Sequence, residues 1–226
     1  MHLVIVSCTP RPIRNSNTAK IIEKFKQGFE RQGGNTTETY YLAQRSSWEE
    51  IRQAFYHNDH ILFAIPLFVE CIPGIMLEFL DTLQPKTYDS GKERTKVSFL
   101  LQGGFAEASQ LRCGEQYLEM LPQYFNCEYA GTLIKGNMFA VSMVEGKGRE
   151  AMIEPFVQMG ETFAQDGAFH KEKVTEFAKP EYFSKGFIIF FRFVSPLQKM
   201  FLSSFSKKKL GRKESIKAKP YQKYIQ

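Results

Sequence analysis

Residues 2–18 read HLVIVSCTPRPIRNSNT, an apolar run followed by a turn rich in serine, proline and asparagine. Four consecutive aliphatic residues at positions 3–6 are typical of a buried strand. From residue 17 to about residue 32, apolar residues recur at helical spacing, and a pair of glycines ends the pattern. The apolar face consists of Ala19, Ile22, Phe25 and Phe29. The stretch therefore predicts a strand, a polar turn and a helix.

The same alternation continues to residue 166. Further strands are expected at 37–42, 60–65, 96–101 and 129–134, and helices at 47–56, 73–83, 108–124 and 148–166. Ser47, followed three residues later by Glu50, predicts a capping box. Pro155 interrupts the last helix near its first turn. Strands separated by helices, with right-handed crossovers, predict an α/β fold with a five-stranded parallel sheet and helices on both faces.

Charge is distributed unevenly along the 226 residues, whose formal net charge is +6. Residues 185–226 contain eleven Lys or Arg against one acid, Glu214, whereas residues 1–184 contain 19 basic and 23 acidic residues. The basic balance therefore belongs to the tail, which disfavours a protein that reads nucleic acid with its body. We expect two parts, a domain at 1–168 and an extension at 169–226.

The four cysteines form no CxxC pair, and the sequence starts directly with a strand-like run. Free thiols and a cytoplasmic location are the simplest interpretation. The cysteines are Cys8, Cys71, Cys113 and Cys127. Cys8 and Cys71 lie in two of the three loops described next, so a redox-sensing role for either stays open.

Three loops follow strands of the predicted sheet at its carboxyl edge, where open parallel sheets bind their ligands. The first lies between strand one and its helix, and offers hydroxyl, amide and guanidinium groups beside a helix N-terminus, which favours an anion such as a phosphate monoester. The groups belong to Ser7, Thr9, Arg11, Arg14, Ser16, Asn17 and Thr18. The loop lacks GxGxxG and GxxxxGK[ST], so a dinucleotide or a nucleoside triphosphate is disfavoured. An ordinary helix cap remains the alternative.

The second and third loops differ in character from the first. Residues 66–74 are mostly apolar, and Phe68 offers a flat partner for a planar ligand, unless it packs under a neighbouring loop or a second subunit. Residues 102–107 contain Gly103 and Gly104, which let the backbone approach a ring closely and offer N–H donors, unless they form a plain turn.

Together the three loops resemble a known family, the flavodoxin-like NAD(P)H-dependent FMN reductases and quinone oxidoreductases, over roughly residues 1–165. The matching motifs are Ser7…Pro10-Arg11…Ser16-Asn17-Thr18, Pro66-Leu67-Phe68 with 73–81, and 103–107. The resemblance implies a flavodoxin-like three-layer sandwich with strand order 2-1-3-4-5, to which the chain adds an aromatic and basic helical extension. It also implies FMN, NAD(P)H and a homodimer.

The resemblance also implies the cofactor-binding residues. Arg11, Ser16, Asn17 and Thr18 would hold the FMN phosphate, and Gly103, Gly104 and Phe105 would lie at the pyrimidine edge of the ring. Pro66, Leu67 and Phe68 would border the ring, and the set is completed by Ser7, Thr9, Val69 and Glu107. No catalytic acid or base and no metal ligand is expected.

The function expected from this resemblance is hydride transfer from NAD(P)H through bound flavin to a quinone, nitro compound or second flavin, by ping-pong turnover. Two alternatives stay open. One is a flavodoxin-type electron carrier with no nicotinamide substrate, although residues 1–184 are only weakly acidic for such a carrier. The other is a membrane-surface or scaffolding protein that keeps the fold without the cofactor.

The tail contains the most apolar run of the chain, residues 187–194, and a basic run at 207–209. It is too short and too interrupted to span a bilayer. The sequence alone favours a helix that packs on the body or on a second subunit. A peripheral position on an anionic membrane surface stays open, and nucleic acid is the least favoured partner.

Overall fold

A computed structural model describes residues 1–68, 71–194 and 204. The chain forms two compact units, Met1–Tyr182 and Phe183–Gln226. The division therefore lies after Tyr182, while the sequence suggested one after residue 168. In the second unit, residues 185–194 are helical.

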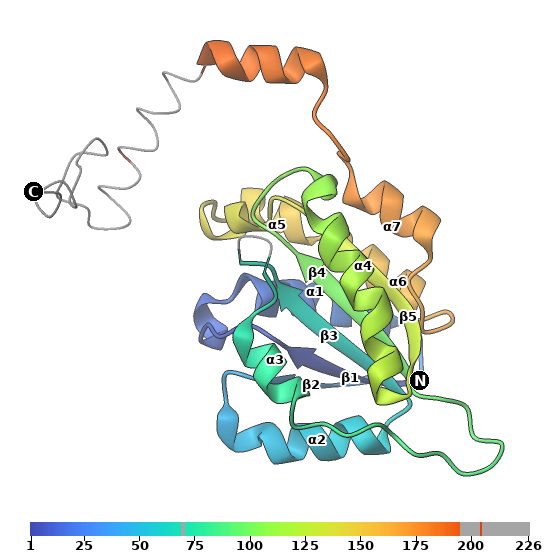
Figure 1. The fold of residues 1–226 in the computed structure, drawn as a ribbon. Coiled ribbons are helices and arrows are strands. Elements are labelled where there is room, and N and C mark those ends of the chain that lie inside the picture. The colour runs from blue at the N-terminus through green and yellow to red at the C-terminus, as the bar shows by residue number, and fades with distance from the viewer. Residues whose placement is uncertain (69–70, 195–203, 205–226) are drawn as a thin grey trace, which may run out of the picture. The chain divides into compact units, whose positions relative to one another are not determined.

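The centre of the first unit is a parallel sheet of five strands in the order β2-β1-β3-β4-β5, as predicted (Figure 1). The strands are β1 His2–Ser7, β2 Thr36–Tyr41, β3 His60–Pro66, β4 Lys96–Gln102 and β5 Glu128–Lys135. β1, β3 and β4 are buried almost throughout, which explains why their sequences read as continuous apolar runs. Their carboxyl ends meet at one edge of the sheet.

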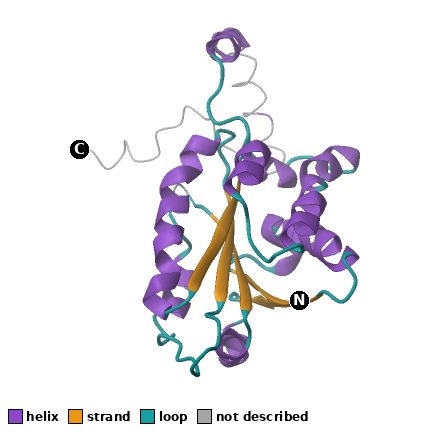
Figure 2. Cartoon of the chain, turned by 90° about the vertical axis from the view of Figure 1, so that its right-hand side faces the viewer, coloured by secondary structure: helices purple, strands orange, loops and turns teal. Residues whose placement is uncertain are grey.

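Helices cover both faces of the sheet (Figure 2). On one face α1 (Asn17–Arg31) packs along α6 (Pro155–Phe163), with α5 (Lys147–Ile153) beside them. The approach is close because both helices carry glycine there: a Cβ at Gly160 would lie 2.1 Å from the carbonyl oxygen of Phe25. α3 (Gly74–Leu80) and α4 (Arg112–Met120) lie in front of the sheet in Figure 1. α2 (Trp48–His57) joins α3 through the Trp48 and Phe79 rings, whose centroids are 5.5 Å apart.

Three helix predictions need correction. The helix expected at 148–166 is divided between α5 and α6, because Pro155 starts a new helix. The helix expected at 108–124 begins and ends in 3₁₀ turns, Ala108–Leu111 and Leu121–Phe125. The capping box at Ser47 does not form: a 3₁₀ turn at Arg45–Ser47 runs directly into α2, so the Ser47 side chain makes no capping hydrogen bond.

One more helix, α7 (Lys171–Ala178), belongs to the first unit and packs against β5. Its Val174 and Ala178 side chains are buried in the core. The Nζ of Lys135, at the end of β5, donates to the carbonyl oxygen of Phe177 at 2.5 Å. This bond fixes the last turn of α7 at the carboxyl edge of the sheet.

Candidate functional site

A cavity of about 420 Å³ lies at the carboxyl ends of β1, β3 and β4. The three loops singled out in the sequence meet there, because their strands are neighbours in the sheet. Ten predicted residues line it: Thr9, Arg11, Asn17, Thr18, Pro66, Leu67, Phe68, Gly103, Gly104 and Phe105. Ser7, Ser16 and Glu107 are not among the lining residues, and Val69 lies outside the described residues.

The N-terminus of α1 forms one wall. Ser16 is buried and caps the helix: its Oγ accepts a hydrogen bond from the Ala19 N–H at 3.1 Å. Ser16 is therefore the helix cap that was the alternative interpretation of this loop. The N–H groups of Asn17 and Thr18 lie in the first turn, where the helix offers them no carbonyl acceptor. No acidic residue lies in the first turn of α1.

Two cationic side chains, Lys20 and Arg149, lie near this helix end. The Nζ of Lys20 donates to the Ser16 carbonyl oxygen at 3.4 Å. Burial and the nearby charge of Arg149 lower the pKa of Lys20. With Arg11 in the cavity wall, the helix dipole and these cations make this end of the cavity favourable for an anion.

Polar side chains in the cavity wall keep unused hydrogen-bonding capacity. The Nδ2 of Asn17 donates to the Met138 carbonyl oxygen at 2.9 Å, but its Oδ1 is buried and has no partner among the described residues. The Oγ1 of Thr18 accepts from the Nε2 of Gln102 at 3.2 Å, which leaves the hydroxyl proton for another acceptor. Buried polar atoms are normally paired, so the Asn17 Oδ1 indicates a missing partner.

Three phenylalanines border the cavity. The side chains of Phe68, Phe105 and Phe139 are 39%, 58% and 51% exposed. Phe68 is held in place by a two-bond bridge to Cys71, with N–O distances of 3.0 and 3.1 Å. Three exposed rings around one cavity favour a planar apolar ligand that would cover them.

Backbone bonds fix the glycine loop. The Gly103 N–H donates to Lys135 O at 3.0 Å, and the Asn137 N–H donates to Phe105 O at 2.7 Å. A Cβ at Gly103 would lie 2.7 Å from the Cδ2 of Leu111, so a larger residue there would displace the Leu111 side chain. Within the described residues, the N–H groups of Gly104 and Phe105 have no hydrogen-bond acceptor.

Four lining residues were not predicted from the sequence: Gln102, Gln110, Leu111 and Phe139. Gln102 was noted as the first residue of the third loop, but no role was assigned to it. Phe139 lies in a turn whose start, Asn137, has a positive φ of 63°, and the Gly136-Asn137 pair is the signal that indicates such a turn.

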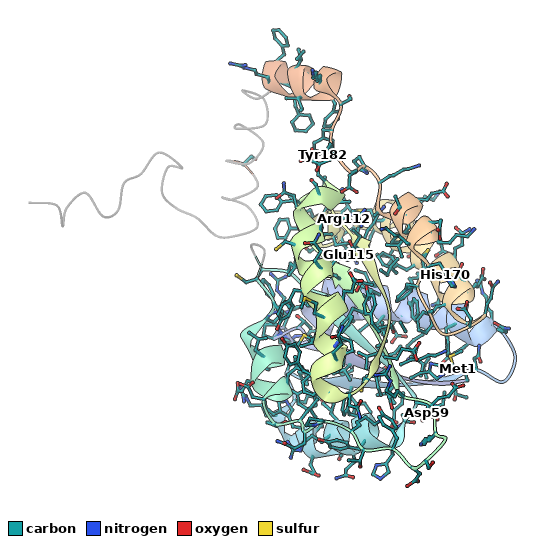
Figure 3. The ribbon with its side chains drawn as sticks, turned by 45° about the vertical axis from the view of Figure 1, so that its right-hand side comes forward. Met1, Asp59, Arg112, Glu115, His170 and Tyr182 are labelled. Carbon is teal, nitrogen blue, oxygen red and sulfur yellow. The ribbon has the colours of Figure 1, made fainter. Side chains whose placement is uncertain are left out.

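The last residues of the first unit are held beside the cavity wall, next to Gln110 and Leu111. Arg112 forms a bidentate pair with Glu181, with N–O distances of 3.1 and 2.7 Å, and also bonds Glu115. The Ala108 N–H donates to Pro180 O at 2.9 Å. Figure 3 shows Arg112 and Glu115 near Tyr182, far from Asp59 at the other end of the unit. The pairing lowers the pKa of Glu181.

Comparisons with known proteins agree with this architecture. No family model and no curated protein matches the sequence. Among solved structures, an NAD(P)H:quinone oxidoreductase from Methanothermobacter marburgensis is similar, with a TM-score of 0.53, 16% identity, and coverage of 74% of this chain and 98% of that one. An FMN-dependent NADH-azoreductase from Bacillus anthracis, in complex with FMN, has a TM-score of 0.54 and 14% identity over 75% of this chain and 100% of its own.

A third similar structure, an NADH:FMN oxidoreductase in its apo form, has a TM-score of 0.53 and 16% identity over 73% of this chain and 90% of its own. At these identities the likeness shows the fold, which is flavodoxin-like. About a quarter of this chain lies outside each of these matches.

Proposed function

We propose that the chain is an FMN-dependent NAD(P)H oxidoreductase. The observation that carries this proposal is the cavity, which joins an anion-binding helix end to three exposed phenylalanine rings. A phosphorylated planar ligand matches both ends. The names of the three similar structures support the same chemistry, because each is a nicotinamide-dependent reductase of a quinone, an azo compound or FMN.

The residues present fit FMN. The N–H groups of Asn17 and Thr18 would donate to its phosphate, and the Arg11 guanidinium would neutralise the charge. The Asn17 Oδ1, which lacks a partner within the described residues, would accept a hydrogen bond from a ribityl hydroxyl. The ring would lie against Phe68, with its polar edge toward the N–H groups of Gly104 and Phe105.

FMN, when bound, would supply the hydride chemistry that connects NAD(P)H with a quinone, nitro compound or second flavin. The chain's part is to bind and to orient. The described lining residues include no carboxylate, imidazole or thiol, so no protein acid or base is assigned. Phe105 and Phe139 would present one apolar face to both substrates in turn, which predicts ping-pong kinetics.

Anaerobic mixing of the FMN-loaded protein with NADH or NADPH tests this function. We expect the flavin absorbance to bleach and to recover on addition of menadione, with parallel double-reciprocal plots. A bound flavin that neither nicotinamide reduces would instead indicate an electron carrier. A protein that takes up no FMN would refute both.

The homodimer also remains a proposal. Exposed apolar side chains recur along one face of α4 and the 3₁₀ turn that follows it, at Tyr117, Met120 and Tyr124. This spacing forms a single stripe on a helix surface, which suits a second copy better than water does. Sedimentation equilibrium should give twice the chain mass, and Tyr117→Glu with Met120→Glu should give the monomer. A monomeric wild-type protein would refute the proposal.

A further inference from the structure

The helix at residues 185–194 of the second unit reads KGFIIFFRFV and carries only two charged residues, Lys185 and Arg192. Phe183, just before the helix, Phe187 and Phe191 form a row of tilted rings, with successive centroids 4.5 and 4.8 Å apart. The other apolar side chains point elsewhere and remain open to water; those of Phe190 and Phe193, for example, are 61% and 81% exposed.

The apolar residues occupy most of the helix circumference, and the two charged residues, Lys185 and Arg192, share the remaining side. At 100° per residue, 187 and 191 lie on one side, 188 on a second, and 190 and 193 on a third. A helix that packs in a protein groove needs only one apolar stripe and keeps a polar face for water. This helix is apolar on three sides, which is more than one groove covers, and its single charged side suits a position in the acyl region of a bilayer with Lys185 and Arg192 toward the headgroups.

The length of this helix agrees with insertion into one leaflet. Ten residues rise about 15 Å, half of the roughly 30 Å hydrocarbon core. Among the described residues, no helix is long and apolar enough to cross a membrane. A shallow insertion by so short a segment binds weakly, so stable attachment needs a second signal.

The sequence supplies that second signal. Beyond residue 194 it contains nine Lys or Arg and one acid, with three consecutive lysines at 207–209. Such a cluster beside an apolar segment is attracted to anionic headgroups. Residues 1–184, with 23 acids against 19 bases, have the opposite sign and would not themselves approach an anionic surface. The two signals are therefore adjacent in the chain and separate from the cavity residues.

We propose that the helix at residues 185–194, with the basic sequence that follows it, docks this protein on a bilayer that contains anionic lipids. In this arrangement, Phe187, Phe190 and Phe193 insert among the acyl chains of one leaflet, and the positive charge of the sequence beyond residue 194 is attracted to the lipid phosphates. The proposal concerns the second unit and is independent of flavin binding.

Vesicle sedimentation with the full chain tests the proposal. We expect the protein to sediment with vesicles of equimolar phosphatidylcholine and phosphatidylglycerol, and much less with phosphatidylcholine alone. Phe190→Ser with Phe193→Ser should weaken binding at least about tenfold, since each ring loses its burial in lipid. The matched control is Tyr182→Ser, an equally exposed aromatic of the first unit, which should bind as the wild type does.

A second variant tests the electrostatic part. Lys207→Gln, Lys208→Gln and Lys209→Gln together should weaken binding to the anionic vesicles by about fivefold for each lysine, and leave binding to phosphatidylcholine unchanged. The alternative is that this helix binds a second copy of the chain. Sedimentation equilibrium of each variant tests for it by measuring the mass in solution. A wild-type chain that does not sediment with anionic vesicles would overturn the proposal. The proposal would also be overturned if Phe190→Ser with Phe193→Ser bound anionic vesicles as the wild type does, or if this variant lost self-association but kept vesicle binding.

Discussion

Buried polar groups are paired to different degrees at the two ends of the sheet: at the amino end His60 Nδ1 lacks a partner among the described residues, but the Lys86 ammonium is fully paired, whereas three side-chain oxygens lack partners at the carboxyl end. At the amino ends of β3 and β4, Lys86 is buried, and its Nζ donates to Phe55 O at 2.8 Å, to Asn58 O at 3.1 Å and to Thr95 Oγ1 at 2.5 Å. At the carboxyl ends, Asn17 Oδ1, Ser7 Oγ and Ser109 Oγ are buried without a partner among the described residues.

The apolar side chains show the same contrast. Phe55, whose ring lies 5.4 Å from the Lys86 Nζ, is buried in the core. Phe68 and Phe105 at the cavity are exposed. The three hydrogen bonds of Lys86 stabilise the fold at the amino end, whereas the unused donors, acceptors and rings around the cavity lower stability unless a ligand covers them. The unused groups at the carboxyl end support the site proposed there, and each prediction below tests one of the two ends.

The largest effect is expected at the amino end, on stability. Lys86→Met removes one donor from three buried oxygens and should lower the free energy of unfolding by about 3 kcal/mol. The midpoint of urea denaturation measures the loss. Lys92→Met, which breaks only an exposed 3.5 Å pair with Asp59, is the control and should change stability by less than about 0.5 kcal/mol. Equal losses in the two variants would contradict the described role of Lys86.

The next effect is expected at the carboxyl end, on affinity. Arg11→Ala should weaken FMN binding about 30-fold, because one charge-assisted bond to the phosphate is lost. Riboflavin has no phosphate, so its affinity should not change. Fluorescence titration of both flavins measures the difference, and Arg14→Ala, outside the cavity wall, is the control. A parallel loss for riboflavin would show that Arg11 does not contact the phosphate.

A smaller effect is expected at the ring end of the cavity. Phe68→Ala should weaken FMN and riboflavin alike, by about tenfold, because the lost stacking surface contacts the part that both share. Tyr182→Ala removes an exposed aromatic away from the cavity wall and should leave both affinities unchanged. If Phe68→Ala affects FMN alone, the orientation proposed for the ligand is reversed.

The smallest effect is a pH dependence. Burial and Arg149 lower the pKa of Lys20 below its ordinary 10.5, and a bound phosphate would raise it again by favouring the charged form. Binding of FMN should therefore take up protons, and the FMN-to-riboflavin affinity ratio should fall about threefold as pH rises through the lowered pKa.

Lys20→Arg provides the control for this titration, since an arginine stays charged and should keep the ratio flat. A fall of the same size in Lys20→Arg would assign the titration to another group.

Much of this organisation could be predicted from the sequence. The strands β1, β3 and β4 were found because burial on both faces makes each a continuous apolar run, and their order placed the three loops at one edge. The start of α1 was predicted because Ser16 and Asn17 are strong capping types, and Ser16 does cap it.

The remainder depends on contacts between distant parts of the chain. Phe139 borders the cavity because Asn17 bonds Met138 O across 121 residues, a pairing that no local pattern reveals. The apparent capping box at Ser47 failed because the 3₁₀ turn before α2 placed Ser47 in a conformation with ψ of 2°, away from that of a cap.

The most direct test of the account is a crystal structure of the full chain grown with FMN. We expect a phosphate within hydrogen-bond distance of the Asn17 and Thr18 N–H groups and an isoalloxazine ring against Phe68. A cavity closed by its own side chains at saturating FMN, or a flavin whose phosphate lies away from α1, would contradict it.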